Sequence, residues 1–467
     1  MTKSNLVLFY FCFFFIILKL ISISQTNFNL YGDEAQYWLW SKDLSFGYFS
    51  KPPLLSWVIA LVTFLFGESF FVLKIIPVSV YCISSHLIYI LTNKLYNNKS
   101  LSVCCALTFF LLPSVSLSSF ILSTDVILIL FWIGSLIQLL KIKENPSYFN
   151  FIYHGFLLGL AFLAKYAAIY FIISLIILLI VEKKYALVFK KSKLKLLLSL
   201  IVLLLILLPN ILWNYQHGWL TIDHTMNNAS LDKINLNPFG FLKFLASQIV
   251  MIGVILFIGF VIYSFKKIKI NSNEKFLICF SLPTLIIVSL EAFLVRAHAN
   301  WAATSLITLF IFFVYFVYRI NKNIIYINNY LNLIVGVVLF VMIGINIPLE
   351  GFNRISGLKS FTIYLDKKNQ NNIKNIVVDD RLLFANLNYE YKSNEFNFYS
   401  PFKPGNKIVH HFQLKNPLPS NFSQNFILIG NKNNINYLKN NNKIVFLGSS
   451  FPPFVKQDVK IYEVIFD

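Results

Sequence analysis

The chain has 467 residues, of which 57% are hydrophobic, 17% aromatic and only 13% charged, and its mean hydropathy is +0.67. These values exclude an ordinary soluble globular protein and place most of the chain in a lipid bilayer. The formal net charge of +20 does not indicate a nucleic-acid partner, because the lysines cluster in short loops between apolar runs. The cysteines lie in apolar segments without metal-binding or disulfide-framework spacing: Cys12, Cys82, Cys104, Cys105 and Cys279.

Apolar runs long enough to cross a hydrocarbon core of about 30 Å recur along the chain and predict about eleven membrane spans. The first run, Met1 to Leu20, is expected to be retained as a helix, because Ser22 to Asn27 makes a poor signal-cleavage site. Leu54 to Phe66 follows a proline pair and is too short to span, so we expect a re-entrant or interfacial helix. The expected spans are residues 5–24, 70–93, 101–119, 124–140, 151–164, 166–181, 195–209, 238–265, 275–295, 301–318 and 324–347.

Basic residues occupy every second loop between these spans. Short basic loops stay in the cytoplasm, so the pattern predicts a cytoplasmic N-terminus and a C-terminus on the outer face. Asp33, Glu34 and Asp125 then lie at the outer face, where we expect the chemistry. The basic loops contain Lys94 and Lys99, Lys141 and Lys143, Lys183 to Lys195, Lys266 to Lys275, and Arg319 with Lys322.

The composition changes to Asn and Lys from about Gly351 onward. Short β-type runs there predict a small α/β or mixed outer domain over residues 351–467, next to a membrane domain over residues 1–350 whose first outer loop is residues 25–69. His410 and His411 are expected at the surface of that domain. The β-type runs are Asn375 to Asp379, Phe426 to Gly430, Lys443 to Leu447 and Val459 to Phe466.

The first outer loop places Asp33 and Glu34 at the start of a short amphipathic helix, where the helix dipole favours ionised carboxylates. An ionised carboxylate at the membrane surface is a candidate general base. Tyr37, Trp38 and Trp40 would hold the helix in the interface. The alternative is that the two carboxylates only mark a helix start on a solvated loop.

Two further ionisable residues lie at the rim of spans. Asp125 opens one span and Lys165 interrupts an apolar stretch near the outer end of another. Such groups are costly in a membrane and usually serve a partner or a site, although helix capping and snorkelling are the plainer alternatives. Together with Lys51, Lys165 supplies positive charge on the side of the carboxylates, which suits a phosphate-bearing lipid.

Aromatic and amide side chains gather in Pro209 to Trp219 and in Arg296 to Trp301. They suit sugar binding and equally suit an aromatic belt. The candidate contacts are His217, Arg296 and Asn300. The histidine spacing shows no metal-ligand pattern, so no metal site is assigned, and the use of a divalent metal stays open.

The order of these motifs resembles the bacterial members of the protein O-mannosyltransferase superfamily, of the family 39 type. That group is similar to the lipid A aminoarabinose transferases and to the lipopolysaccharide-core galacturonosyltransferases. The resemblance implies an all-α polytopic bundle of the GT-C type with an outer C-terminal domain, and inverting transfer of a sugar from a polyprenyl phosphate. The motifs are Tyr31 to Trp40, Gly47 to Pro53, Ser123 to Asp125, Gly159 to Tyr166, Pro209 to Trp219 and Asn300-Trp301.

The resemblance also implies roles for single residues. Asp33, with Glu34 next to it, matches the acidic residue that activates the acceptor, and Asp125 matches a second carboxylate. Tyr48, Lys51 and Lys165 match residues near the lipid phosphate, and Tyr37 is expected to contact substrate. The implied acceptor is lipid A, lipopolysaccharide core or another envelope glycolipid, on the periplasmic face of a bacterial inner membrane.

The sequence departs from the aminoarabinose transferases directly after Glu34. It continues as Ala-Gln-Tyr-Trp where those enzymes read Pro-Arg-Tyr-Ala, so neither sugar nor acceptor is carried over. Two rival functions stay open. A ligase or polymerase that uses a polyprenyl-diphosphate donor would carry a large outer loop late in the chain, and a transporter of lipid-linked or anionic solutes would show inverted repeats and charges near the midplane.

Overall fold

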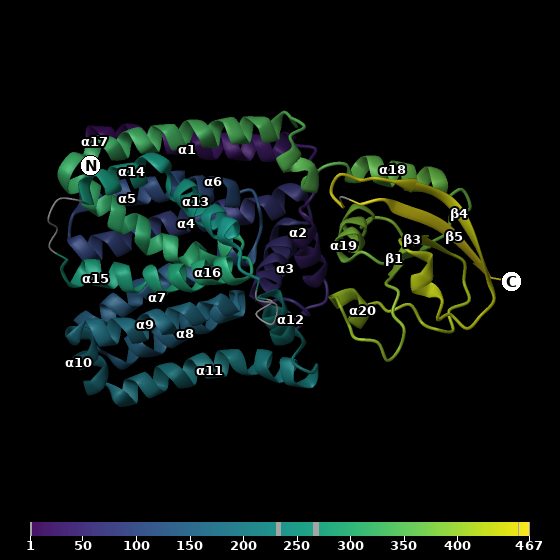
Figure 1. Cartoon of the computed structure of the whole chain (residues 1–467), viewed down its shortest axis with the longest axis horizontal. Coiled ribbons are helices and arrows are strands. Elements are labelled where there is room, and N and C mark those ends of the chain that lie inside the picture. The colour runs from purple at the N-terminus through teal and green to yellow at the C-terminus, as the bar shows by residue number, and fades with distance from the viewer. Residues whose placement is uncertain (1, 230–234, 265–269, 456, 467) are drawn as a thin grey trace. The chain divides into compact units, whose positions relative to one another are not determined.

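The computed structural model describes residues 2–229, 235–264, 270–455 and 457–466. The chain divides into two compact units (Figure 1). The helical unit comprises Met1–Ser24, Lys51–Leu55 and Phe71–Gly344. The mixed unit comprises Gln25–Ser50, Ser56–Phe70 and Ile345–Asp467. The predicted fold class, a helical membrane bundle with a small C-terminal sheet, is confirmed.

Long apolar helices make up the helical unit, and Figure 1 shows many of them lying side by side. Short 3-10 turns, η1 (Tyr166–Ala168) and η2 (Ala299–Ala302), precede α9 and α17. The helices are α1 (Lys3–Gln25), α4 (Phe70–Tyr96), α5 (Lys99–Leu111), α6 (Pro113–Ser118), α7 (Thr124–Glu144), α8 (Tyr148–Ala164), α9 (Ile169–Val181), α10 (Lys183–Lys191), α11 (Lys193–Gln216), α12 (Leu220–Ala229), α13 (Pro238–Ile252), α14 (Val254–Ser264), α15 (Ser272–Cys279), α16 (Leu282–Leu294) and α17 (Ala303–Gly344).

Among the residues that the structure describes, six helices are long and apolar enough to cross a membrane, or eight if each bent pair is one span. The chain is therefore a multi-pass membrane protein, and the count of about eleven stays a prediction. Two expected spans are interrupted: α6 begins at Pro113 after a break at Leu112, and α13 and α14 meet at Gly253 with a 99° bend. The non-helical residue Asn321 of α17 lies between two expected spans, residues 301–318 and 324–347, and agrees with that division.

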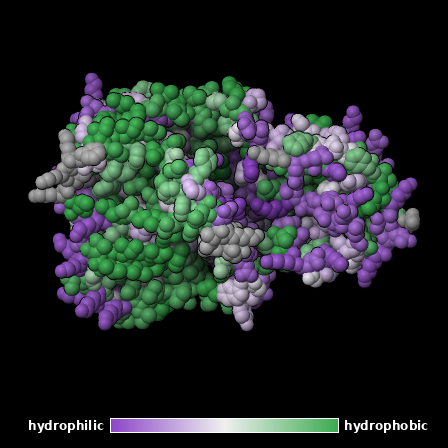
Figure 2. Space-filling view, viewed as in Figure 1, coloured by the Kyte–Doolittle hydropathy of each residue, from purple (hydrophilic) through white to green (hydrophobic). Residues whose placement is uncertain are grey.

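The predicted basic loops meet at one end of the helical unit. The Asn5 amide donates to the Ser100 carbonyl over 3.0 Å, Lys94 pairs with Glu144 at 2.7 Å, and Lys275 approaches Glu182 at 3.9 Å. Figure 2 shows apolar residues over much of the visible face of this unit and polar residues at the end that holds α10. The predicted alternation of basic and non-basic loops therefore agrees with the observed contacts between the basic loops. Lys266, Lys267 and Lys269 lie outside the described residues.

The mixed unit is built around a five-stranded sheet of order β2-β1-β3-β5-β4, in which β1 pairs in parallel with β2 and β3 while β5 is antiparallel to β3 and β4. All four predicted β-type runs are strands, and the short β2 is an addition to them. The elements are α2 (Gly32–Trp40), α3 (Leu54–Phe66), η3 (Glu350–Ile355), α18 (Leu358–Lys368), β1 (Asn375–Val378), α19 (Arg381–Glu390), β2 (Asn397–Tyr399), α20 (His411–Lys415), β3 (Phe426–Ile429), η4 (Lys432–Ile435), β4 (Asn442–Ser450) and β5 (Val459–Phe466).

The first outer loop packs into the mixed unit, whereas the sequence suggested that it belongs to the membrane domain. Helix α2 lies on α19, and the approach is close because residue 32 is glycine. A Cβ at Gly32 would lie 2.9 Å from the Cβ of Leu382. The expected surface position of His410 and His411 is wrong, because the two residues are only 6% and 4% exposed.

Candidate functional site

The structure brings Asp125, Lys165 and Asn300 together from three separate motifs. Lys165 Nζ lies 2.7 Å from Asp125 Oδ1, and Asn300 Nδ2 donates to Asp125 Oδ2 over 2.9 Å. The side chains of Asp125 and Lys165 are only 12% and 17% exposed. Asp125 lies in the first turn of α7. Two residues predicted for different roles are thus partners in one shielded ion pair.

A fourth motif joins this group through the residue after Lys165. The Tyr166 hydroxyl donates to Asn210 Oδ1 over 2.8 Å and accepts from Asn214 Nδ2 over 3.2 Å. Both asparagines lie on α11 and are buried. The chain can change direction here because Lys165 is in an extended conformation between α8 and η1. The amide-rich motif therefore supports the turn that carries Lys165.

Helices α8 and α11 approach closely at two glycines spaced four residues apart. A Cβ at Gly155 would overlap the Ser199 carbonyl of α11, and a Cβ at Gly159 would lie 2.9 Å from Ile206. Small residues at this spacing let membrane helices pack with their backbones in contact. Gly155 and Gly159 therefore set the distance between Tyr166 and its asparagine partners.

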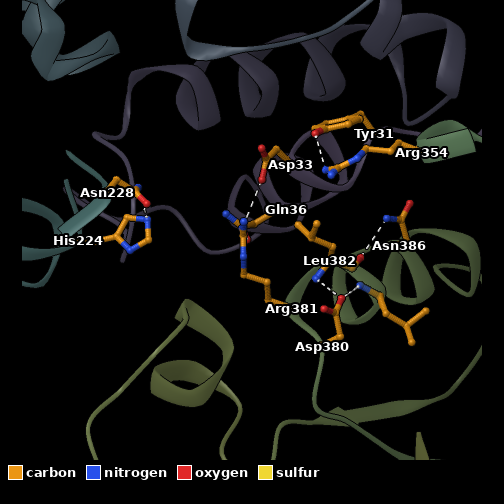
Figure 3. Close-up of polar contacts among 11 residues, drawn as sticks. Tyr31, Asp33, Gln36, His224, Asn228, Arg354, Asp380, Arg381, Leu382 and Asn386 are labelled. Atoms are coloured by element: carbon orange, nitrogen blue, oxygen red, sulfur yellow. Dashed lines mark hydrogen bonds and ion pairs between the residues drawn. The ribbon is translucent and has the colours of Figure 1, made fainter. Parts of the chain in front are cut away.

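The other sequence-predicted residues of the helical unit are His217, Arg296 and Lys51. His217 follows α11, stacks on Trp213 with a ring-centroid distance of 4.1 Å, and its Nδ1 lies 2.8 Å from the Trp213 carbonyl. His224 of α12 contacts Asn228 of the same helix at 3.0 Å (Figure 3). Arg296 is exposed in the segment between α16 and η2. Lys51 is half-buried directly before Pro52.

The two carboxylates at the start of α2 have different surroundings in the mixed unit. Glu34 is 1% exposed, and its carboxylate accepts from the Tyr31 backbone N–H over 2.8 Å, which closes a capping box. Asp33 is 39% exposed and accepts from Arg381 Nη1 over 3.3 Å. Glu34 therefore stabilises the helix start, and Asp33 is the carboxylate that solvent and a substrate can reach.

Arg381 contacts Asp33, although the sequence did not indicate it as part of the candidate site. The same Nη1 that contacts Asp33 donates to Gln36 Oε1 over 2.8 Å (Figure 3). It is the first residue of α19 and lies 348 residues from Asp33 in the chain. No local pattern joins residues so far apart, so only the fold reveals the pair.

The aromatic residues of the first loop form a buried stack. Trp40 and Tyr48 stack with ring centroids 4.6 Å apart, and His411 packs edge-on against both rings. The Tyr48 hydroxyl donates to the Trp40 carbonyl over 2.9 Å, and burial raises the pKa of Tyr48 to about 12. Tyr37 is 4% exposed and packs against Trp40. These contacts give Tyr48 and Tyr37 a role in holding the loop, where the sequence suggested contact with substrate.

Within the described residues, no group of three or more His, Cys, Asp or Glu side chains is arranged to hold a metal ion. The candidate residues thus consist of a half-exposed carboxylate beside an arginine in the mixed unit, and the Asp–Lys–Asn cluster of the helical unit, in which the Asp125–Lys165 ion pair is shielded and Asn300 is exposed. Carboxylates can accept protons from hydroxyls, and ammonium groups can hold phosphate oxygens.

Comparison with known proteins places this architecture in a known fold. Two crystal structures of ArnT from Cupriavidus metallidurans, in the apo state and bound to undecaprenyl phosphate, match 99% of this chain and 98% of theirs. Their TM-scores are 0.68 and 0.69, at 11% sequence identity. The fold is therefore the GT-C fold that the motifs implied.

Two sequence comparisons indicate which glycosyltransferases this chain is similar to. Residues 50–213 match the family model described as dolichyl-phosphate-mannose-protein mannosyltransferase, a range that contains Lys51, Asp125 and Lys165 but not Asp33. The lipid A galacturonosyltransferase RgtD of Rhizobium johnstonii is 29% identical over 296 residues, which cover 62% of this chain and 61% of that relative. The predicted resemblance is confirmed: the chain has the GT-C fold, and its sequence is similar to that of a transferase that modifies lipid A.

Proposed function

We propose that this protein is a membrane glycosyltransferase that moves one sugar from a polyprenyl-phosphate donor to lipid A or another envelope glycolipid. The observation that carries the proposal is the sequence similarity to a lipid A galacturonosyltransferase. The reaction takes place on the periplasmic face of a bacterial inner membrane, with the N-terminus in the cytoplasm and the C-terminus in the periplasm. The chemistry of the candidate residues supports this assignment.

Asp33 acts as the general base. Its half-exposed carboxylate lies in the first turn of α2. It takes the proton of an acceptor hydroxyl, whose oxygen attacks the anomeric carbon of the donor while the bond from that carbon to the phosphate oxygen breaks. The configuration at the anomeric carbon inverts, and polyprenyl phosphate leaves. Glu34 supports Asp33 by capping the helix.

Cationic side chains hold the phosphate and the charge that develops on it. Lys51, Lys165 and Arg296 are the candidates, because ammonium and guanidinium groups bind phosphate oxygens through charge-assisted hydrogen bonds. Lys165 is held in place by Asp125, which is in turn held by Asn300. His217 and the aromatic residues near it offer surfaces that suit a sugar ring.

The proposal is tested by measuring lipid A, core and glycoprotein masses in a deletion strain complemented with the wild-type gene or its variants. We expect the wild type to restore a mass increment of one glycosyl residue. Asp33→Asn is expected to lower transfer by about 100-fold or more, since general-base catalysis contributes about 10²–10⁴. Lys51→Ala is expected to lower it by a similar factor, because it removes a charge from the leaving phosphate.

Asp43→Asn is the matched control. Asp43 lies in the same loop and pairs with Lys415 at 2.6 Å, but its side chain is 65% exposed and has no assigned role. We expect this variant to keep full activity. Unchanged masses after deletion, with a change in solute uptake, would show a transporter, and altered polymer length without a change in lipid A would show a ligase or polymerase.

A further inference from the structure

Arg381 connects the C-terminal part of the mixed unit to the helix that carries Asp33. Its Nη1 contacts Asp33 Oδ1 at 3.3 Å and Gln36 Oε1 at 2.8 Å, as Figure 3 shows. Gln36 is 3% exposed, one turn after Asp33 on α2. The guanidinium group is thus held by a buried amide and at the same time touches one oxygen of the carboxylate.

A side-chain cap defines the start of α19, where Arg381 is the first helical residue. The Asp380 side chain accepts from the backbone N–H groups of Leu382 and Leu383 over 2.9 and 2.8 Å, and so caps the helix. Leu382 packs on Gly32 at the start of α2 with no room for a larger residue. This packing therefore sets the distance between the start of α2, which carries Asp33, and the start of α19, which carries Arg381.

The contact leaves the carboxylate able to react. Arg381 engages Oδ1, and within the described part of the chain no hydrogen bond to Asp33 Oδ2 is found. The shorter of the two guanidinium contacts is the one to Gln36, so Arg381 stays in place when Asp33 binds a hydroxyl. A fixed positive charge bonded to one oxygen orients the other.

We propose that Arg381 is a positioning residue that orients Asp33 toward the acceptor hydroxyl. The C-terminal segment of the mixed unit thereby sets the orientation of the Asp33 carboxylate but supplies no reacting group. The inference rests on the proposed function, because it requires Asp33 to act as the base. A purely structural arginine would affect stability alone, and an arginine that blocks Asp33 would restrain the activity.

The test measures kcat and KM for the full-length protein in detergent, with donor and acceptor lipids extracted from the native envelope. Arg381→Gln is expected to lower kcat by about 10- to 100-fold with little change in KM, since small displacements of a reacting group cost rates of this order. Arg381→Lys keeps the charge and is expected to recover part of that loss. Added to Asp33→Asn, Arg381→Gln is expected to cause no further loss, because the two residues act as one unit.

Arg354→Gln is the matched control. Arg354 Nη1 donates to the Tyr31 hydroxyl over 3.2 Å at the same end of α2, and among the described residues it makes no hydrogen bond or ion pair with Asp33. This variant is expected to keep wild-type kcat. Gln36→Leu provides a second route if Arg381→Gln folds poorly: it removes the shorter guanidinium contact, keeps the charge, and is expected to lower kcat several-fold.

The outcomes separate the inference from the proposed function. If wild type is active and Asp33→Asn is not, but well-folded Arg381→Gln keeps its kcat, the positioning role is wrong and the proposed function stands. A rise in activity for Arg381→Gln would show that Arg381 blocks Asp33, and this result would also contradict the positioning role. The positioning role is likewise contradicted if Arg381→Gln lowers the activity of Asp33→Asn by the same factor as it lowers that of wild type. If the wild-type protein transfers no sugar, the proposed function is wrong, and the positioning role, which depends on it, is wrong as well.

Discussion

At the scale of single residues, Asp125 and Lys165 combine an ion pair with a proposed substrate contact, and the two roles can be separated. Their side chains are shielded, so removing one partner leaves the other charge without compensation. We expect Lys165→Met to destabilise the protein by about 1–3 kcal/mol, and the double variant Asp125→Asn/Lys165→Met to recover much of that loss. A thermal double-mutant cycle measures this coupling.

Sugar transfer by Lys165→Met and by the double variant measures the second role of Lys165, its proposed contact with the substrate. The double variant is expected to be stable yet inactive, because it still lacks the ammonium group that holds the donor phosphate. If stability and activity both return in the double variant, Lys165 serves the ion pair alone. Asn300→Ala, which removes only the amide on Asp125 Oδ2, is expected to cause a smaller loss in each measurement.

His410 makes the stability of the mixed unit dependent on pH. Burial, together with the positive charge of Arg381, lowers the pKa of His410 to about 4. The folded state therefore prefers the neutral ring, and its stabilising contribution is complete above the unfolded pKa of about 6.5. That contribution is lost as pH falls from about 6.5 toward 4, because the unfolded chain binds the proton first.

We accordingly expect His410→Gln to weaken the pH dependence of the thermal unfolding midpoint. The midpoint of wild type should fall more steeply than that of the variant between pH 7.5 and 5, when both full-length proteins are measured in the same detergent. Comparing the two proteins at each pH cancels the contribution of the other titrating groups. Parallel curves would show that His410 does not titrate in this range.

The sequence indicated single candidate residues where local chemistry was sufficient. Asp33, Asp125 and Lys165 stood out because carboxylates and amines are rare among apolar spans. The sequence could not show that Asp125 and Lys165 are paired, nor that His410 is buried, because both facts depend on contacts between distant segments. Arg381 was hidden for the same reason.

At the scale of elements, the crossing of α8 and α11 governs the helical unit near the Asp–Lys–Asn cluster. A Cβ at Gly155 would overlap the backbone of Ser199, so Gly155→Ala is expected to push α11 away, lower the thermal unfolding midpoint and reduce sugar transfer. Gly134→Ala on α7 is the control, because its Cβ would meet Leu157 at an ordinary 3.5 Å. Equal effects of the two substitutions would contradict this account of the crossing.

Helix ends were less predictable than helices. Apolar length identifies a membrane helix well, and Leu54 to Phe66 was placed with its observed bounds. The breaks at Pro113 and Gly253 lie within continuous apolar runs, so composition alone did not show them. The Asn328 side chain accepts from the Leu256 N–H over 3.1 Å after the second break, and this tertiary contact supplies a partner for the start of α14.

At the scale of the whole molecule, the change of composition near Gly351 predicted a separate outer domain and most of its strands. The membership of that domain was not predictable. Its compact unit also takes in Gln25–Ser50 and Ser56–Phe70, which adjoin the first span in sequence. Packing of α2 on α19 causes this, and the apolar residues of a short amphipathic helix do not specify what they pack against.

The discontinuity of the mixed unit sets an order for biosynthesis. Residues 25–50 are made well before residues 345–467, with which they form one compact unit. Until those later residues are made, α2 lacks α19, so Asp33 lacks Arg381 and Trp38 lacks its contact with Tyr389. A nascent chain therefore inserts its helices before it completes the carboxylate environment, and a prematurely terminated chain contains Asp33 without the residue that orients it.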